Sequence, residues 1–519
     1  MSILLLPLLA PVPLLLSAGV SFLSRGRRPR LAVGLAEGAT LLSLALAMVS
    51  AIGLAISGGG SSALLGVGEI GLSARLDAVS AAMLVLVAFI GWVVVRYAGT
   101  YLDGEARQGR FMGWLCLTLA AVLLLVVSNN LIQLALAWAA AGLFLQRLLL
   151  FHPERIAAQR AARKNLIISR LADGALALGA VGLTLAYGGT DIGLILESAR
   201  AGEGGGLAVA AAGLLALAAL LKSAQFPFHG WLTEVMETPT PVSALLHAGV
   251  INAGGFLLIR FADVMLLAPG VLAVLVMIGG FTALFGSLVM LTQPAVKTSL
   301  AWSTVAQMGF MILQCGLALF PLALLHILAH SLYKAHSFLA SGGAVERVTQ
   351  IRRPGPVAIP GAGAVARAFL AALAIYVVIG LGFGLTHKSP QTLALGAILI
   401  FGVAYMLAQG FADAAPAALT RRTAVYAVVT SAGYFALQMA AVQLTSGVLP
   451  PTPAPGGLEW ALMVLAVFSF GVVAVVQAMF PLWAHHPAAA GLRVHLSNGF
   501  YANAVFDRLI GGWSVRRPS

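Results

Sequence analysis

The sequence predicts an all-α polytopic membrane protein with about 14–15 transmembrane helices. Two observations predict this fold class. First, 60% of the 519 residues are hydrophobic and only 9% are charged, whereas a soluble domain carries roughly 25% charged residues. Second, apolar runs long enough to cross a bilayer recur along the whole chain, separated by short polar segments. This composition excludes a soluble enzyme domain, a disordered chain and a disulfide scaffold.

The apolar runs define the expected helices. A spanning helix needs about 20 predominantly apolar residues. Runs of this kind begin near residues 2, 31, 78, 111, 131, 165, 205, 241, 269, 299, 321, 365, 391, 423 and 457. The basic cluster of the first run follows its apolar stretch, and no small-residue cleavage site stands out, so we expect a retained helix and not a signal peptide.

Positive charge is distributed unevenly between the two sets of loops. Of the 30 Lys and Arg residues, 23 fall in alternate loops that would share one side of a membrane, and four fall on the other side. Cytoplasmic loops carry such an excess. We therefore expect a multi-pass protein of the bacterial inner membrane with a cytoplasmic C-terminus. The same distribution explains the net charge of +13 without a nucleic-acid partner.

A lysine and a proline interrupt the apolar run that begins near residue 205. Lys222 ends this run, and Pro227, which lacks a backbone donor, should break the helix. A broken helix at membrane depth is tolerated beside protein or a water-filled cavity, and a charge there is functional by default. The alternative is a lysine whose ammonium reaches the membrane surface.

Two acids follow this break. Glu234 and Glu237 are spaced to share one helix face, and two prolines then lead into a helix that carries His247. Either these acids belong to an ion path, or they are solvated acids of a cytoplasmic loop.

The strongest pattern is a stripe of titratable residues on one later helix. His326, His330 and Lys334 are spaced to lie along one face, about 6 Å apart. Such a stripe predicts a proton wire. The alternatives are a metal site, for which no third ligand is nearby, and histidines hydrogen-bonded to neighbouring helices.

Four other charges fall within or at the ends of apolar runs. Arg170 and Asp173 are spaced to pair with each other, and the alternative is a purely structural pair. Lys297 opens the tenth helix, and Lys388 lies near the end of the twelfth. The sequence has no nucleotide-binding loop and no cysteine cluster. We therefore expect no enzyme activity, no metal and no cofactor in this chain, and energy from an ion gradient or a partner.

A longer motif carries a family resemblance. The segment Lys222-Ser-Ala-Gln-Phe-Pro-Phe-His229, Trp231-Leu232 and the run from Pro239 to His247 resemble the signature of antiporter-like proton-conducting subunits of respiratory complex I and Mrp antiporters. A second block around Ala301-Trp-Ser-Thr304 and Phe338-Leu-Ala-Ser-Gly342 agrees with it. The resemblance covers roughly residues 70–390.

The resemblance implies two inverted five-helix repeats, each with a broken helix. They would occupy residues 111–262 and 263–412, between N-terminal helices in 1–110 and C-terminal helices with a short cytoplasmic tail in 413–519. Lys222 and Lys388 would lie on the broken helices. The remaining path would comprise Glu234, His247, Lys297, His326, His330 and Lys334, with Arg170, Asp173 and Glu237 as supporting ion pairs.

One departure from the family pattern points to a particular branch. The family usually has a glutamate directly after the tryptophan of the fifth helix, but here Trp138 is followed by Ala139. This departure, the short length and the tail from Leu492 to Arg508 resemble the membrane subunit of DAB-type inorganic carbon pumps. That branch implies a large peripheral zinc-containing partner, similar to a carbonic anhydrase, on the cytoplasmic face. The alternatives are a subunit of a cation/proton antiporter or of complex I, and a scaffold that conducts nothing.

Overall fold

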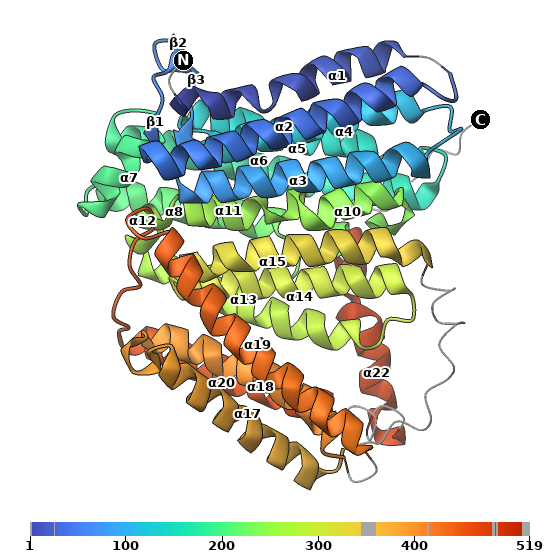
Figure 1. Ribbon diagram of the computed structural model, residues 1–519, viewed down its shortest axis with the longest axis vertical. Helices are drawn as coiled ribbons and strands as arrows, with labels where there is room; N and C mark the ends of the chain where they lie inside the picture. The colour runs from blue at the N-terminus through green and yellow to red at the C-terminus, as the bar shows by residue number, and fades with distance from the viewer. Residues whose placement is uncertain are drawn as a thin grey trace.

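The computed structural model describes residues 3–24, 26–343, 360–412, 415–479, 483 and 486–510. In these residues the protein is a layered bundle of long helices that lie roughly side by side (Figure 1). The strands are short and lie near one end of the bundle, where β1 pairs with β4 and β2 pairs with β3, both antiparallel. Their bounds are β1 (Gly60–Ser61), β2 (Leu65–Val67), β3 (Ile70–Leu72) and β4 (Arg75–Leu76).

Thirteen helical stretches of the described chain are long and apolar enough to cross a membrane. Two of these spans are composite, because η1 (Ile3–Leu9) precedes α1 and η3 (Val250–Asn252) separates α10 from α11. The helices of the thirteen spans are α1 (Val12–Leu23), α2 (Arg30–Ser57), α3 (Ala78–Tyr101), α4 (Gln108–Val127), α5 (Leu131–Leu149), α6 (Ile156–Tyr187), α8 (Gly205–Lys222), α10 (Thr240–Ala248), α11 (Ala253–Arg260), α13 (Pro269–Met290), α17 (Ala362–Gly382), α18 (Pro390–Gly410), α19 (Ala417–Leu444) and α20 (Gly457–Ala478).

Two further helices have the length of a span but a more polar composition. They are α14 (Val296–Gly316) and α15 (Phe320–Leu339), of 21 and 20 residues. These two helices carry Lys297 and the predicted histidine stripe. With them, the long helices correspond to the fifteen runs read from the sequence. The multi-pass membrane fold is therefore confirmed, whereas the inverted repeats, the orientation and the segment boundaries stay predictions.

Local sequence explains where several helices begin and end. Asp77 and Ser80 form a reciprocal capping box at the start of α3, and the Asn130 side chain accepts backbone N–H groups at the start of α5. Pro269 and Pro390 occupy first positions of α13 and α18, where the missing donor costs nothing. The sixth helix was expected near residue 165, but α6 begins at Ile156 and is 32 residues long.

The apolar core has two main parts. One continuous cluster runs through α1–α15, and a separate cluster joins α17, α18 and α19. A smaller cluster from α13, α14, α18 and α20 connects the two regions. In Figure 1, α17–α20 form a distinct layer below α13–α15, and α19 crosses the view obliquely. We call α1–α15 the central bundle and α17–α20 the outer bundle.

Short elements cover both ends of the bundle. At the strand end lie α7 (Ile192–Arg200) and α12 (Ala262–Leu266), and η5 (Leu385–His387) follows α17. Near the opposite end, α9 (Gly230–Thr233) and η2 (Val235–Glu237) follow α8, and η4 (Ala340–Gly343) follows α15. The C-terminal tail comprises η6 (Pro487–Ala489), α22 (Ala490–Ser497), η7 (Gly499–Tyr501) and α23 (Ala502–Ile510).

Candidate ion path in the central bundle

Lys222 lies buried at a break in its helix, as predicted. Helix α8 ends at Lys222, and the chain turns through Pro227 before α9 begins. The lysine is only 5% exposed, and its Nζ atom lies 5.2 Å from the centre of the Trp138 ring. The ammonium therefore does not reach the membrane surface, which excludes the alternative of a snorkelling side chain.

An acid from α6 lies near Lys222, where the residue after Trp138 is the uncharged Ala139. The guanidinium of Arg170 lies 2.7 Å from the Asp173 carboxylate. A Cβ added at Gly142 would lie 3.2 Å from Lys222 Nζ and 3.4 Å from Arg170 Nη2, so both cations approach the same point on α5. Asp173 also lies within electrostatic reach of Lys222. The predicted Arg170–Asp173 pair thus forms, and it forms beside Lys222.

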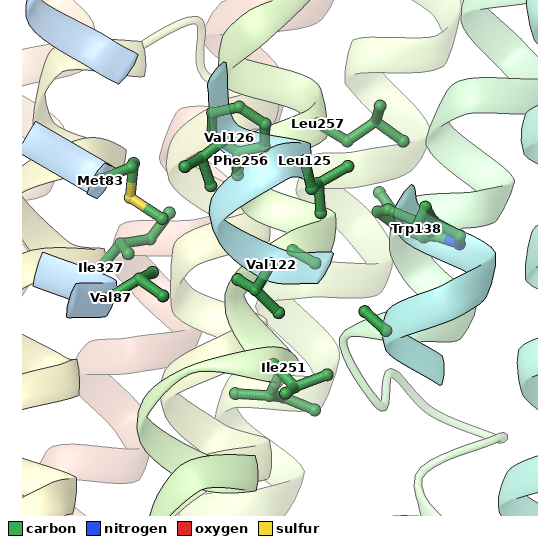
Figure 2. Close-up of a cluster of buried hydrophobic side chains, with 14 of the residues drawn as sticks. Met83, Val87, Val122, Leu125, Val126, Trp138, Ile251, Phe256, Leu257 and Ile327 are labelled. Atoms are coloured by element: carbon green, nitrogen blue, oxygen red, sulfur yellow. The ribbon is translucent and has the colours of Figure 1, made fainter. Parts of the chain in front are cut away.

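Apolar side chains enclose the centre of the bundle. Figure 2 shows this cluster, with Trp138 beside apolar residues of the neighbouring helices. Its labelled members come from α3 (Met83, Val87), α4 (Val122, Leu125, Val126), η3 (Ile251), α11 (Phe256, Leu257) and α15 (Ile327). In such surroundings a charge is stable only with nearby polar partners.

His247 connects three helices. Its Nδ1 atom lies 3.0 Å from the Thr304 hydroxyl of α14, and its ring stacks on Phe338 of α15 at 4.3 Å. Its backbone carbonyl lies 3.2 Å from His330 Nε2. The span that carries His247 is itself interrupted after Gly249 by η3, a break that the sequence analysis did not predict.

The predicted stripe on α15 lies inside the protein. The rings of His326 and His330 stack with centres 6.0 Å apart, and Lys334 donates to the Leu300 carbonyl at 3.1 Å. Lys334 is fully buried and His330 is 5% exposed. Lys297 lies one turn before Leu300, in the partly exposed first turn of α14. In the described chain, no group of three or more His, Cys, Asp and Glu is placed to hold a metal ion.

Glu234 and Glu237 pair with bases of α6 and its preceding loop. Glu237 lies 2.9 Å from Arg155, with both side chains exposed. Glu234 lies 2.6 Å from Lys164, which is completely buried. The bases around Lys164 in the sequence indicate a loop, but α6 begins at Ile156 and contains this residue, so a loop position is wrong. Glu234 is therefore not the local substitute for the acid missing after Trp138.

Lys388 lies near the end of the twelfth expected helix, as the sequence indicates, but it does not lie on a broken helix. It lies beyond the end of α17, after η5, and the next helix α18 is a full-length span. Lys388 is thus at the end of a span and not at a break within one, because Gly384 and Pro390 place a turn and a new helix start around it. Its Nζ atom lies 5.6 Å from the Phe435 ring centre, beside a cavity of about 710 Å³.

Three functional or structural positions were missed by sequence reasoning. His229 is fully buried among Phe226, Phe285 and Trp302, and neither ring nitrogen has a partner within the described residues. Its place in the quoted motif was the available signal. Lys164 and the pair of Asp77 with Arg260, at 2.6 Å, had no such signal, because their partners are distant in sequence.

The Asp77 pair fixes the strand end of the bundle. Burial raises the pKa of the Asp77 carboxyl, but Arg260 and Arg75 outweigh this effect and hold the pKa well below its usual range. Arg260 is 4% exposed at the end of α11. The pair ties α11 to the start of α3, so it is structural.

Comparison with known proteins identifies the family. Residues 128–354 match the family model described as NADH:quinone oxidoreductase/Mrp antiporter, TM, and residues 65–112 match that of NADH-ubiquinone oxidoreductase (complex I), chain 5 N-terminus. The "Probable inorganic carbon transporter subunit DabB2" of Halothiobacillus neapolitanus is 37% identical over 86% of this chain and 81% of its own length. The chain belongs to this family of antiporter-like membrane subunits.

Two other proteins support the family and its fold. The "Probable inorganic carbon transporter subunit DabB" of Hydrogenovibrio crunogenus is 48% identical over 51% of this chain, and the match spans about half (52%) of that relative. In the structure of the Mrp complex from Dietzia sp. DQ12-45-1b, one chain shares the fold with a TM-score of 0.62 at 23% identity, over 98% of this chain and 60% of its own.

Proposed function

We propose that this chain is the cation-conducting membrane subunit of a pump that accumulates inorganic carbon, with protons as the preferred cation. The observation that carries the proposal is the buried Lys222 beside a broken helix, with the partly exposed ion pair of Arg170 and Asp173 next to it. A buried charge in a membrane protein is costly and marks ion pathways by default. Support for the carbon substrate comes from the names of the relatives described above.

The proposed path runs from Lys222 through His247 to the stripe on α15. His247 is hydrogen-bonded to Thr304 and adjacent to His330, which in turn stacks against His326. The ring atoms Nε2 of His247 and His326 are buried without a partner in the described chain. Buried polar atoms are normally hydrogen-bonded, so these are the positions at which water would complete a chain for proton transfer. Lys334 and Lys297 form its end near η4.

The position of Lys388 does not support a place for it in this path. The two five-helix repeats would correspond to α4–α11 and α13–α18, with the break after Lys222 in the first. We therefore assign conduction to the central bundle and treat the outer bundle as its flank.

The proposed partner is a large peripheral zinc-containing protein similar to a carbonic anhydrase. It would dock at the basic end of the bundle, where the C-terminal tail lies, and would hold both the zinc and the chemistry of CO2 hydration. The membrane chain would supply the ion flux that makes this hydration one-way. No enzymatic step is proposed for the chain itself.

The second candidate is a subunit of a cation/proton antiporter or of complex I, which the two family models favour. Purification of the tagged chain in mild detergent, with mass spectrometry and zinc analysis, separates the two candidates. A large soluble zinc protein is expected. Co-purifying flavin and iron–sulfur subunits, or a set of small antiporter membrane subunits, would contradict the carbon-pump proposal.

A matched pair of variants tests conduction. Lys222→Ala should abolish growth support at low CO2 in cells that also produce the partner, while the complex still assembles. Asp103→Asn is the control, because it removes only the exposed contact of Asp103 with Arg28. If assembled Lys222→Ala supported normal growth, the conduction proposal would be contradicted, and the chain would instead be a scaffold that conducts nothing.

A further inference from the structure

A completely buried ammonium group lies between two carboxylates where α6 meets the C-terminal tail. Lys164 Nζ is 2.6 Å from Glu234 Oε1 and 2.6 Å from Asp507 Oδ1. The Lys164 side chain has no exposed surface, whereas the two acids are 27% and 28% exposed. The acids therefore connect solvent with a cation that solvent does not reach.

This cluster leads inward towards Lys222. Glu234 directly follows α9, the short helix after the break. His229 lies between Lys222 and Glu234 in the sequence. Its two ring nitrogens have no hydrogen-bond partner in the described chain, and it is within electrostatic reach of Lys164. Polar groups thus lead from the two acids through Lys164 and His229 into the broken segment. The His229 ring lies among the aromatic rings of Phe226, Phe285 and Trp302.

The tail forms one side of this cluster and covers the broken segment. Asn503 donates to the Thr233 hydroxyl at 3.3 Å, and Phe506 packs edge-on against Phe228 at 5.9 Å. A Cβ added at Gly230 would collide with the Asn503 side chain, which would have to move away. Most other residues of α22 and α23 are exposed or only partly buried. An element with few buried contacts opens at low cost.

We propose that Lys164 is a further residue of the ion path, at its entrance, and that the C-terminal tail closes this entrance through Asp507. The inference rests on the proposed function. When Lys222 is a neutral amine, a proton passes to it from the Lys164 ammonium through water held at the two ring nitrogens of His229, which leaves a neutral amine at Lys164. Glu234, protonated from solvent, returns a proton to that amine and becomes a carboxylate again.

The same transfer explains how the tail opens. With Lys164 charged, one ammonium holds two carboxylates. When Lys164 is neutral, Asp507 loses its cation, and any negative charge on Glu234 then repels it. The tail is therefore released while Lys164 is neutral and is held again when Lys164 is protonated. This couples the entry of one proton to movement of the tail.

Two substitutions at Lys164 separate proton transfer from mere anchoring. Lys164→Arg keeps the charge that holds the tail, but a guanidinium does not release a proton. Inorganic carbon uptake by cells producing the full complex should fall at least tenfold, because a positioned acid–base group contributes about 10²–10⁴-fold. Full uptake with Lys164→Arg would show that Lys164 only anchors the tail and would overturn its place in the path.

Closure is measured without any transport assay. A thiol at position 233, introduced as Thr233→Cys, reports access beneath the tail, and both native cysteines are buried. Asp507→Asn should increase its labelling rate by a membrane-impermeant maleimide several-fold, and Lys164→Met should do the same. Asp103→Asn is the matched control and should leave the rate unchanged. Equal labelling in all variants would overturn closure by Asp507.

An engineered disulfide tests movement of the tail independently, in case Lys164→Arg itself displaces the tail. Thr233→Cys combined with Asn503→Cys should lock the tail, because the two native side chains are in contact. Uptake should stop under oxidation and return after reduction, whereas either single variant should be insensitive. Undiminished uptake by the locked protein would overturn the moving closure and would leave the conduction proposal, tested by Lys222→Ala, unaffected.

Discussion

The central bundle and the outer bundle differ in how deeply they bury charged side chains and in the partners that they give them. In the central bundle, Lys222, Lys334 and Arg260 are each 5% exposed or less, and each lies against a defined partner. In the outer bundle, Lys388 lies beyond the end of α17, partly exposed, and contacts an aromatic face. Spans α19 and α20 are also far less enclosed by protein than the span from Thr240 to Arg260.

This difference indicates where in the fold a buried charge can be stabilised. A charge can stay buried only where neighbouring helices supply counter-charges and hydrogen bonds, since desolvation otherwise exceeds the gain. Helices enclosed on all sides provide such neighbours, and helices facing lipid do not. The predictions below test whether burial with partners is what separates the two bundles.

The largest effect on stability is expected at the strand end of the central bundle. Arg260→Met leaves the Asp77 carboxylate buried without its main partner, which should cost about 3–5 kcal/mol. Thermal unfolding of the purified chain in detergent measures this loss. The double variant with Asp77→Asn should regain part of it, because the uncompensated charge is gone. A single variant as stable as Asp103→Asn would contradict the structural role.

The lowered pKa of Asp77 sets the pH range of that contribution. A carboxyl whose folded pKa lies below its unfolded value stabilises the fold above the unfolded value, near pH 3.9, and loses this contribution as the pH falls towards the folded value. Between pH 6 and pH 8 the native protein therefore keeps the full contribution of this pair.

The next effect concerns the charge partner of Lys222. Asp173→Asn leaves Lys222 and Arg170 as neighbouring cations, so uptake of inorganic carbon should fall at least about tenfold, equivalent to 1.4 kcal/mol. Ala139→Glu should restore part of the uptake, since position 139 lies one turn from Gly142, where both cations meet. If Ala139→Glu restores nothing although the double variant assembles, the acid of α6 has a role other than replacing the missing glutamate.

Sequence patterns predicted those features that depend on local spacing. The order of the spans, the helix break after Lys222 and the stripe on α15 all follow from composition, a proline and helical periodicity. Burial of Lys164 could not be predicted, because it follows four other bases in a segment that looks like a cytoplasmic loop and its acidic partners are far away in the chain. The expectation that Lys388 lies on a broken helix was wrong for a related reason. An apolar run does not reveal whether a helix breaks inside the membrane or ends at its surface.

A smaller effect is expected at the hydrogen bond of His247. Thr304→Val keeps the side-chain shape but removes the hydroxyl that lies 3.0 Å from the ring. Loss of one such bond costs about 1 kcal/mol, so thermal stability should fall slightly and uptake by several-fold. Thr184→Val is the control, because its hydroxyl only contacts a carbonyl of its own helix. Equal behaviour of the two variants would argue that the His247 ring needs no fixed orientation.

The smallest effect is expected in the outer bundle. Lys388→Gln removes a charge that has no ion pair within the described residues, and its contact with the Phe435 ring contributes about 0.5–1 kcal/mol. Uptake should stay within about twofold of the native value, because the adjacent cavity is lined by polar side chains such as Gln438 and Thr445 that a glutamine can join. A loss as severe as that of Lys222→Ala, with assembly intact, would place the ion path in both bundles. Partial exposure at the end of a span would then suffice for conduction, and burial with partners would no longer separate the two regions.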